Sequence, residues 1–309
     1  MKSCCLTGAN GYLGRLLTAR LAREKPAVSV CTIDLAAAPP LNGVAAHQAD
    51  IRSPALHDIF AAEKPDVVVH LAFYTHPEGD AREAASVNLE GTRNIAAAAA
   101  AAGVRRFVLV SSAAAYGSHA DNPLPLSEEH ALRPNEFFYY SKHKAEQEQI
   151  VQDIFKDQPA TALVILRPAA VIGPHINNPT GDALRGALLF YPSGKAPPIQ
   201  LIDEDDAVEA FCRAALGETA GVFNVGADGV LTYPDFARLL NKRMLRLPFP
   251  LLAALATAGK RLGLSPVSAT TLRFIRHPIV MDTSRFHRVF AFTPRRDTLA
   301  AFTRFAASL

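Results

Sequence analysis

The first fourteen residues constrain the fold more than any other stretch. Residues 3–6 are a short apolar run that predicts a buried strand, and residues 15–23 carry apolar side chains at helical spacing. Between them, Gly8, Gly11 and Gly14 follow the pattern G-x-x-G-x-x-G. Glycine tolerates the backbone angles of a tight turn, and a helix start presents free N–H groups and a positive dipole end to a pyrophosphate. The segment therefore predicts a strand, a phosphate-binding turn and a helix, which together begin a dinucleotide-binding fold.

An acidic residue stands where such a fold needs one. Asp34 ends the next predicted strand, residues 28–33, about 20 residues beyond the glycines. A carboxylate there can accept hydrogen bonds from both ribose hydroxyls of an adenosine, and it repels a 2′-phosphate. No Lys or Arg follows Asp34 before Arg52, so we expect NAD rather than NADP as the cofactor. The alternative, a glycine-rich turn and a surface aspartate without a ligand, fits this spacing less well.

Strand-like and helix-like segments alternate as far as residue 167. Further strands are predicted over 44–49, 65–72, 106–112 and 162–167, and helices from residue 53, over 81–102 and over 137–155. This alternation indicates an α/β fold, a Rossmann-type doubly wound parallel sheet with helices on both faces. After residue 167 Pro and Gly become frequent. We expect an NAD-binding domain over 1–168 and, over 169–309, mainly a smaller α/β substrate-binding domain at the carboxyl edge of the sheet.

Composition excludes several classes of protein. A net charge of +3 in 309 residues is too small to argue for nucleic acid or an anionic membrane as a partner. The four cysteines show neither metal-binding nor disulfide spacing, which predicts no metal site and a reducing, cytoplasmic location. We expect no signal peptide, because the apolar start runs directly into the glycine turn. The most apolar later stretch, 247–258, is too short to span a bilayer and predicts a buried or cleft-lining helix.

Tyr140 and Lys144 form a Tyr-x-x-x-Lys pair within the helix predicted over 137–155. Their side chains stand one turn apart on one face. A tyrosine normally titrates near pH ~10, and a neighbouring ammonium group lowers that pKa. A serine from the Ser111-Ser112 pair after the fifth strand could hold a carbonyl oxygen. These are the protein groups that hydride transfer with a nicotinamide requires, although Tyr and Lys at this spacing also occur on many surface helices.

Taken together, the chain resembles the extended short-chain dehydrogenase/reductase family, the group of NAD-dependent epimerases and dehydratases. The specific motifs are 7–14 (TGANGYLG), 50–52 (DIR), 70–72 (HLA), 88–92 (NLEGT), Ser111-Ser112, Tyr140 with Lys144, and 166–168 (LRP). Looser matches are 205–206, 223–226 and 281–285. The resemblance implies that Ser112 is the catalytic serine, Tyr140 the acid–base and Lys144 the group that holds the ribose. It also implies that 199–226 returns to the NAD-binding domain.

The resemblance implies a cofactor site and an assembly as well. A homodimer is expected through a four-helix interface made by the alanine-rich helix 81–102 and the helix that carries Tyr140. The implied cofactor-binding residues are Gly8, Asn10, Gly11, Tyr12, Leu13, Gly14, Asp34, Asp50, Ile51, Leu71, Ala72, Phe73, Asn88, Ser111, Tyr140, Lys144 and Pro168.

Two departures from the family pattern bear on the substrate. Family 4,6-dehydratases carry an Asp-Glu pair directly after the catalytic residue, where this chain has Ala113 and Ala114, so a dehydratase is disfavoured. Family enzymes for nucleotide sugars usually carry an arginine and a histidine where this chain has Ile199 and Asp203. The arginine is absent and Asp203 adds negative charge close by, so we expect a substrate that depends less on a diphosphate grip. Other cations of the second domain could substitute for the missing arginine, namely Arg185, Lys195, Arg273 and Arg276.

Three functions remain open from the sequence. The first is net hydride transfer that oxidises an alcohol or reduces a carbonyl. The second is epimerisation of a sugar nucleotide with a bound NAD. The third, a catalytically silent NAD-binding protein, is disfavoured by the complete set of Ser112, Tyr140 and Lys144.

Overall fold

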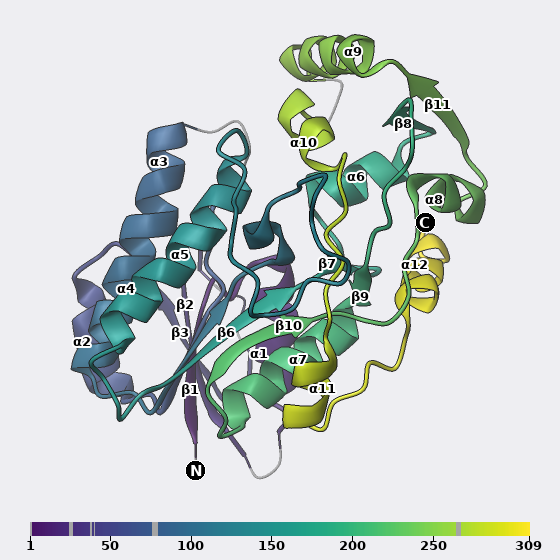
Figure 1. The fold of residues 1–309 in the computed structure, drawn as a ribbon. Coiled ribbons are helices and arrows are strands. Elements are labelled where there is room, and N and C mark those ends of the chain that lie inside the picture. The colour runs from purple at the N-terminus through teal and green to yellow at the C-terminus, as the bar shows by residue number, and fades with distance from the viewer. Residues whose placement is uncertain (1, 25–26, 38, 40, 76–79, 264–266) are drawn as a thin grey trace.

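A seven-stranded parallel sheet forms the centre of the computed structural model, which describes residues 2–24, 27–37, 39, 41–75, 80–263 and 267–309 (Figure 1). The strand order is β3-β2-β1-β4-β5-β6-β10, so the order reverses between β1 and β4. Ligands of open α/β sheets bind at the carboxyl ends of the strands at such a reversal. The strands are β1 (Ser3–Thr7), β2 (Ser29–Asp34), β3 (Val44–Gln48), β4 (Val67–His70), β5 (Arg106–Val110), β6 (Ala162–Pro168) and β10 (Gly221–Val225).

Helices cover both faces of this sheet, as the alternation in the sequence predicts. One face packs against α1 (Tyr12–Leu21), α7 (Glu204–Leu216) and α11 (Ser284–Val289). The other packs against α2 (Ala55–Glu63), α4 (Gly91–Ala101) and α5 (Tyr139–Phe155). Cys4 and Cys5 follow the period of a strand, since they belong to the opposite cores, and both are free thiols. The α/β fold class expected from the sequence is confirmed.

The predicted alanine-rich helix is continuous but not uniform. It consists of α3 (Ala81–Ala85), a π-helical turn η1 (Ser86–Glu90) and α4. Ala96, Ala98 and Ala99 are buried within the chain, whereas Ala97 and Ala101 are exposed. The π-helical turn matters for the site because it carries Asn88, and π-turns inside helices are frequent at functional positions.

The remaining elements lie mainly beyond β6, and several project away from the sheet at the top of Figure 1. Strand β7 pairs with β9, and β8 pairs with β11, each as a parallel two-stranded sheet. These elements are η2 (Ala113–Tyr116), β7 (Ala170–Ile172), α6 (Pro179–Arg185), β8 (Leu188–Pro192), β9 (Leu201–Asp203), α8 (Tyr233–Leu239), β11 (Arg243–Leu247), α9 (Phe249–Arg261), α10 (Ala269–Phe274) and α12 (Thr298–Ala306).

Helix α9 differs from its expected environment. The sequence predicts a buried or cleft-lining helix, and Leu252 and Ala256 are indeed buried. Leu251 and Leu255, however, are 49% and 51% exposed. The prediction was wrong on this side because an apolar stretch shows that a helix forms, not which of its faces has a partner. Among the described residues, none of the helices combines the length and the apolar character needed to cross a membrane.

Candidate functional site

The glycine turn joins β1 to α1 with the geometry that the spacing predicts. Gly8 has a φ of +71°, and a Cβ atom on it would lie 2.6 Å from the backbone nitrogen of Ala72. A Cβ atom on Gly14 would collide with the carbonyl of Gly8. Gly11 begins α1 without a side-chain cap, so the first N–H groups of the helix keep no intrahelical acceptor. The turn is thus a close-packed cradle whose shape requires glycine and whose open donors suit a phosphate.

Asp34 lies beside this cradle and accepts a hydrogen bond from its backbone. Its Oδ2 atom accepts a hydrogen bond from the backbone N–H of Asn10 at 2.9 Å, and Oδ1 accepts one from the N–H of Ala36 at 3.2 Å. A carboxylate has further lone pairs, so these contacts leave capacity for ribose hydroxyls. Asp34 therefore connects the end of β2 to the glycine turn, next to Tyr12 and Leu13.

Asp50 and Ile51 lie after β3 and make contacts within the protein. Asp50 forms a two-pronged pair with Arg52, whose Nη2 lies 2.6 Å from Oδ2, and this pairing lowers the pKa of Asp50. Ile51 is buried and lies against Gly91, where a Cβ atom would be 2.5 Å from its Cδ1. The ion pair thus orients the loop that the resemblance assigns to the adenine.

Asn88 clamps the loop that follows β4. Its Oδ1 accepts from the N–H of Tyr74 at 2.7 Å, its Nδ2 donates to the carbonyl of Tyr74 at 3.3 Å, and Nδ2 also lies 3.2 Å from Nδ1 of His143. Leu71, Ala72 and Phe73 lie between this clamp and the glycine turn. The fully buried amide therefore ties the loop to α5.

Ser112, Tyr140 and Lys144 come together beside this loop. Burial raises the pKa of Tyr140, and a hydrogen bond with Ser112 acts in the opposite direction. Lys144 is buried one helical turn further along α5, and its Nζ donates to the carbonyl of Val110 at 2.9 Å. Phe73 lies against both residues. Its ring centre is 4.1 Å from Nζ of Lys144 and 5.1 Å from the ring centre of Tyr140. The structure thus brings the three predicted catalytic residues into one place.

Burial makes Lys144 unusual. Desolvation lowers the pKa of its amine to about 7, while the charge of Glu148 acts in the opposite direction. An amine with this pKa changes its charge near neutral pH, whereas an ordinary lysine stays charged. The proton on Lys144 is therefore sensitive to whatever binds beside it.

A neutral histidine supports the floor of the site. His70 is fully buried, and burial lowers its pKa to about 3. Its Nδ1 lies 2.6 Å from Oγ1 of Thr7, and its Nε2 lies 2.9 Å from Oγ1 of Thr92. Because Thr92 donates its one hydroxyl proton to the carbonyl of Asn88, the proton of His70 must be on Nε2. This chain of hydrogen bonds fixes β4 between β1 and α4.

Ser111 belongs to a buried ionic network that sequence reasoning missed. Its hydroxyl donates to Glu148 at 2.5 Å, and Glu148 forms a buried ion pair with Arg167 at 2.7 Å. Arg167 also donates to the hydroxyl of Tyr116 at 2.8 Å, and Pro168 ends the same strand. The hydroxyl of Ser111 is thus already engaged within the protein. A signal was present, because Glu148 lies one turn beyond Lys144.

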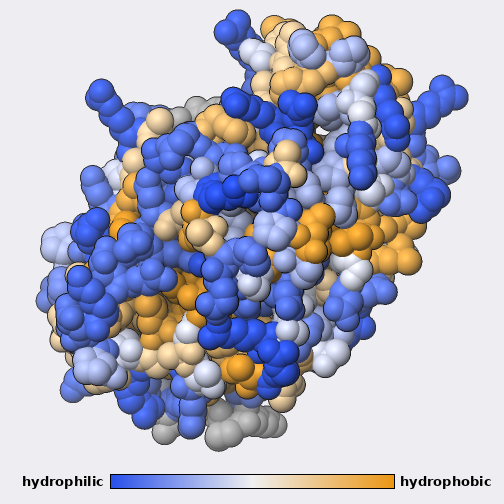
Figure 2. Space-filling view, in the orientation of Figure 1, coloured by the Kyte–Doolittle hydropathy of each residue, from blue (hydrophilic) through white to orange (hydrophobic). Residues whose placement is uncertain are grey.

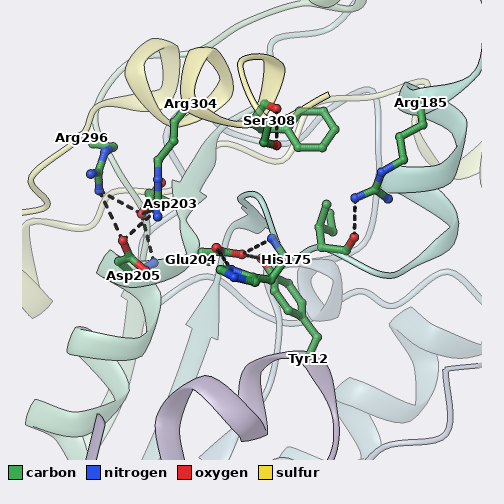
Figure 3. Close-up of polar contacts among 11 residues, drawn as sticks. Tyr12, His175, Arg185, Asp203, Glu204, Asp205, Arg296, Arg304 and Ser308 are labelled. Atoms are coloured by element: carbon green, nitrogen blue, oxygen red, sulfur yellow. Dashed lines mark hydrogen bonds and ion pairs between the residues drawn. The ribbon is translucent and has the colours of Figure 1, made fainter. Parts of the chain in front are cut away.

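Two adjacent carboxylates, Asp203 and Glu204, begin α7 and are fully buried (Figure 3). Asp203 pairs with Arg296 at 3.1 Å and with Arg304 at 2.8 Å. Its charge is therefore compensated, and the sequence-based view of Asp203 as added negative charge is corrected, because both arginines lie about 100 residues away in the chain. Ile199 pairs through its backbone with Leu231, so that position forms part of the fold.

The cations considered as substitutes for a missing arginine have varied surroundings. Arg185 donates to the carbonyl of Ile176 at 2.8 Å, and Lys195 is exposed. The guanidinium of Arg273 lies 3.9 Å from the ring centre of Phe137, and that of Arg276 lies 4.8 Å from the ring centre of Phe249. Within the described part of the chain, no His, Cys, Asp and Glu side chains gather into a group that could hold a metal ion.

Comparison with known proteins identifies the class. Residues 4–226 match the model of the NAD dependent epimerase/dehydratase family, and the chain belongs to this family. An uncharacterised protein of Mycobacterium tuberculosis is 31% identical over 314 residues, which cover 97% of this chain and 82% of that protein.

Solved structures show the same fold. MoeE5 in complex with UDP-glucuronic acid and NAD is similar with a TM-score of 0.77 and 18% identity, over 99% of this chain and 98% of that one. UDP-glucose 4-epimerase of Thermotoga maritima with UDP-glucose has a TM-score of 0.78 at 18% identity, with the same coverage. At this identity the similarity establishes the fold.

Proposed function

We propose that this protein is an NAD-dependent enzyme that transfers hydride to a carbonyl or from an alcohol with a Ser112-Tyr140-Lys144 site. One observation carries the proposal: Tyr140 shares a hydrogen bond with Ser112 and stands one turn from a buried Lys144 whose pKa lies near neutrality. A tyrosine in a structural role does not need a buried amine beside it. Perturbed titratable groups that are arranged together are typical of catalytic sites.

The glycine cradle fits NAD. The open N–H groups at the start of α1 suit the pyrophosphate, and the carboxylate of Asp34 suits an unmodified ribose. NAD, when bound, supplies the centre that accepts or releases hydride. The family to which the chain belongs and the NAD bound in MoeE5 support the same cofactor.

Each protein group has a separate task in this proposal. Tyr140 gives a proton to the carbonyl oxygen of a ketone, or takes one from the hydroxyl of an alcohol. Ser112 donates a hydrogen bond that orients that oxygen. A protonated Lys144 favours the phenolate of Tyr140 and so eases the loss of its proton. Phe73, which packs on the amine, keeps water away from it.

Epimerisation of a sugar nucleotide is the alternative, supported by the similarity to the Thermotoga maritima epimerase. The ultraviolet spectrum of the purified protein distinguishes the two, since an epimerase retains its cofactor and a net oxidoreductase depends on added NAD or NADH. A 4,6-dehydratase is disfavoured because Ala113 and Ala114 cannot supply the acidic pair of that reaction. A silent NAD-binding protein has no use for the complete Ser112, Tyr140 and Lys144 set.

We also propose a division of labour along the chain. Residues 1–168, with 199–226, form the NAD-binding domain, and the rest of 169–309 forms mainly the substrate-binding domain. The pairing of β10 with β6 supports the return of the chain to the first domain.

The four free cysteines support a cytoplasmic location.

The experiment has two stages. A panel of ketones, alcohols and sugar nucleotides is first screened by thermal shift in the presence of NAD, and the best ligand is then used for turnover. Tyr140→Phe is expected to bind NAD like the wild type and to lose turnover by at least about 100-fold. Tyr139→Phe is the matched control and should keep its turnover. Wild-type rates for Tyr140→Phe would remove Tyr140 from the mechanism and refute the proposal.

A further inference from the structure

The segment that contains α9, residues 236–281, is strongly basic although the chain as a whole is nearly neutral. None of the 29 Asp and Glu residues lies within 236–281, whereas eight of the 32 Lys and Arg residues do. The remainder of the chain is therefore net acidic. The eight are Arg238, Lys242, Arg243, Arg246, Lys260, Arg261, Arg273 and Arg276.

The outer face of α9 is apolar, and no side chain among the residues that the structure describes buries it. Leu251, Leu255, Ala258 and Leu262 form one stripe along the helix at the spacing i, i+4, i+7 and i+11, and all are exposed. Leu262, at the C-terminal end of the helix, is 71% exposed. The opposite side of α9 packs on α10. In Figure 2, α9 forms an orange surface at the top of the molecule with blue side chains around it.

A hollow of about 310 Å³ adjoins the end of this stripe. Its lining combines the cations Lys260 and Arg261 with the hydroxyl groups of Thr257, Ser268 and Thr270. Cations of this kind bind phosphate oxygens, whereas the hydroxyl of Thr257 donates to the carbonyl of Ala253 and those of Ser268 and Thr270 bond one another. The apolar stripe and two cations are thus neighbours on one end of the molecule.

We propose that the α9 face, made by the apolar stripe of α9 with Arg246, Lys260, Arg261 and Arg276, docks on the surface of a membrane that contains anionic lipids. A helix of this kind lies in the plane of the interface, with its apolar side among the upper acyl chains and its cations at the headgroups. The 13 residues of α9 cannot span a bilayer, so the contact is superficial. The small net charge of the chain, which argued against an anionic membrane, conceals this local distribution.

Charge favours a membrane over a second copy of the chain. Two α9 faces set against each other would bring their cations together. Because residues 236–281 contain no Asp or Glu to pair with these cations, the repulsion would oppose association. An anionic membrane instead attracts each nearby Lys or Arg by about 1 kcal/mol, which corresponds to about a fivefold gain in binding. The stripe also lies on the convex side of one helix, and this shape suits a fluid lipid surface.

The α9 face is connected to the catalytic helix. The ring centre of Phe274 on α10 lies 4.5 Å from that of Phe138, which directly precedes α5. Docking therefore places the Tyr140 end of α5 toward the membrane. Membrane docking does not require hydride transfer, so Tyr140→Phe should bind vesicles like the wild type. If the proposed chemistry fails, this inference therefore still stands.

The test is flotation of the full-length protein with vesicles. The protein should float with phosphatidylcholine vesicles that contain phosphatidylglycerol, should not float with pure phosphatidylcholine, and should be released by salt. Leu251→Gln/Leu255→Gln should lower the partition by at least about tenfold. Arg246→Ala/Arg261→Ala should lower it by about fivefold for each cation removed.

Matched controls separate docking from a general loss of structure. Leu299→Gln removes an equally exposed leucine of α12, and Arg288→Ala removes an exposed arginine of α11; both should bind vesicles normally. Thermal unfolding should be unchanged in every variant, because all the altered side chains are exposed. No flotation of the wild type with either vesicle would overturn the proposal. Self-association that Leu251→Gln/Leu255→Gln abolishes, without vesicle binding, would show instead that α9 is an interface between copies.

Discussion

The phenol of Tyr12 donates a hydrogen bond of 2.5 Å to the buried carboxylate of Glu204, a residue 192 positions later in the chain. Tyr12 begins the helix behind the glycine turn, and Glu204 also accepts from His175 at 2.6 Å (Figure 3). Gly173 is needed beside them, because a Cβ atom there would collide with Glu204. The glycine turn, which we propose holds the cofactor, is thus tied directly to the loop that follows β7.

Tyr12→Phe should lower the free energy of unfolding by about 1–3 kcal/mol, because it leaves a buried carboxylate with one donor fewer. Glu204→Gln should have a smaller effect on Tyr12, since an amide oxygen can still accept the bond. Urea unfolding of both single variants and the double variant gives their coupling. Strict additivity of the two effects would mean that the bond is equally strong with a neutral acceptor, and an unchanged free energy of unfolding for Tyr12→Phe would mean that this contact contributes nothing to stability.

Asp34→Ser should lower the ratio of the Michaelis constants for NADP and NAD by about tenfold, because it removes the repulsion of a 2′-phosphate. A tenfold change corresponds to about 1.4 kcal/mol in binding free energy. The Michaelis constants of both cofactors measure this directly. Asp58→Ser, on an exposed position of α2, is the control and should leave the preference unchanged. Equal constants for NAD and NADP in the wild type would contradict the assignment of Asp34.

Lys144→Met should stabilise the cofactor-free protein in acid and not in base. Burial lowers the pKa of Lys144 to about 7 from its ordinary 10.5, so the unfolded state binds the proton more tightly. The cost of burying the charge is therefore fully present below pH 7 and disappears as the pH rises toward 10.5. The melting temperature of Lys144→Met should exceed that of the wild type by a few degrees near pH 6, which corresponds to about 1 kcal/mol in the free energy of unfolding. This difference should become smaller as the pH rises above 7. The opposite pH trend would show that Lys144 is charged and compensated in the fold.

A homodimer is expected through α4 and α5, where Ala97 and Ala101 form an exposed stripe of small residues. Light scattering at micromolar concentration should give twice the mass of the chain. Ala97→Glu/Ala101→Glu should yield monomers, and Ala61→Glu, at an exposed position of α2, should not. A monomeric wild type would mean that the alanines of α4 serve packing within one subunit only.

UDP should bind weakly, with a dissociation constant above about 1 mM. A constant of that size corresponds to a binding free energy of about −4 kcal/mol. Ile199 offers no charge, and Arg296 and Arg304 are already paired with Asp203. Calorimetry on the NAD-loaded protein tests this. Micromolar binding that disappears in Arg273→Ala or Arg276→Ala, but not in Arg288→Ala, would show that a diphosphate grip exists at another place.

The sequence predicted the parts of the fold that depend on neighbouring residues. Apolar runs marked β1, β4 and β5, and alternation of strands with helices marked the parallel sheet, because period and length are local properties. The glycine turn was equally accessible, since Gly8 and Gly14 occupy positions that the structure shows no other residue can fill without a collision.

Contacts between distant segments were not predictable in the same way. Nothing near Glu204 in the chain identifies Tyr12 as its partner, and nothing near Asp203 identifies Arg304. The exposure of Leu251 was missed for a related reason, since the side of a helix that finds a partner is decided by tertiary packing. Pattern reasoning locates elements, and only the assembled chain decides which charges meet.

The edge position of β10 has a consequence for how the protein is made. Until residues 221–225 leave the ribosome, β6 presents an unpaired edge to the solvent, and Leu17 and Leu21 of α1 lack the cover that α7 provides. A nascent chain that ends after residue 168 therefore holds nearly all the predicted cofactor-binding residues on an incomplete sheet whose exposed edge is prone to aggregation. Synthesis must pass through the segment that contributes α6, β8 and β9 before the sheet can close, so the two halves of this protein mature together.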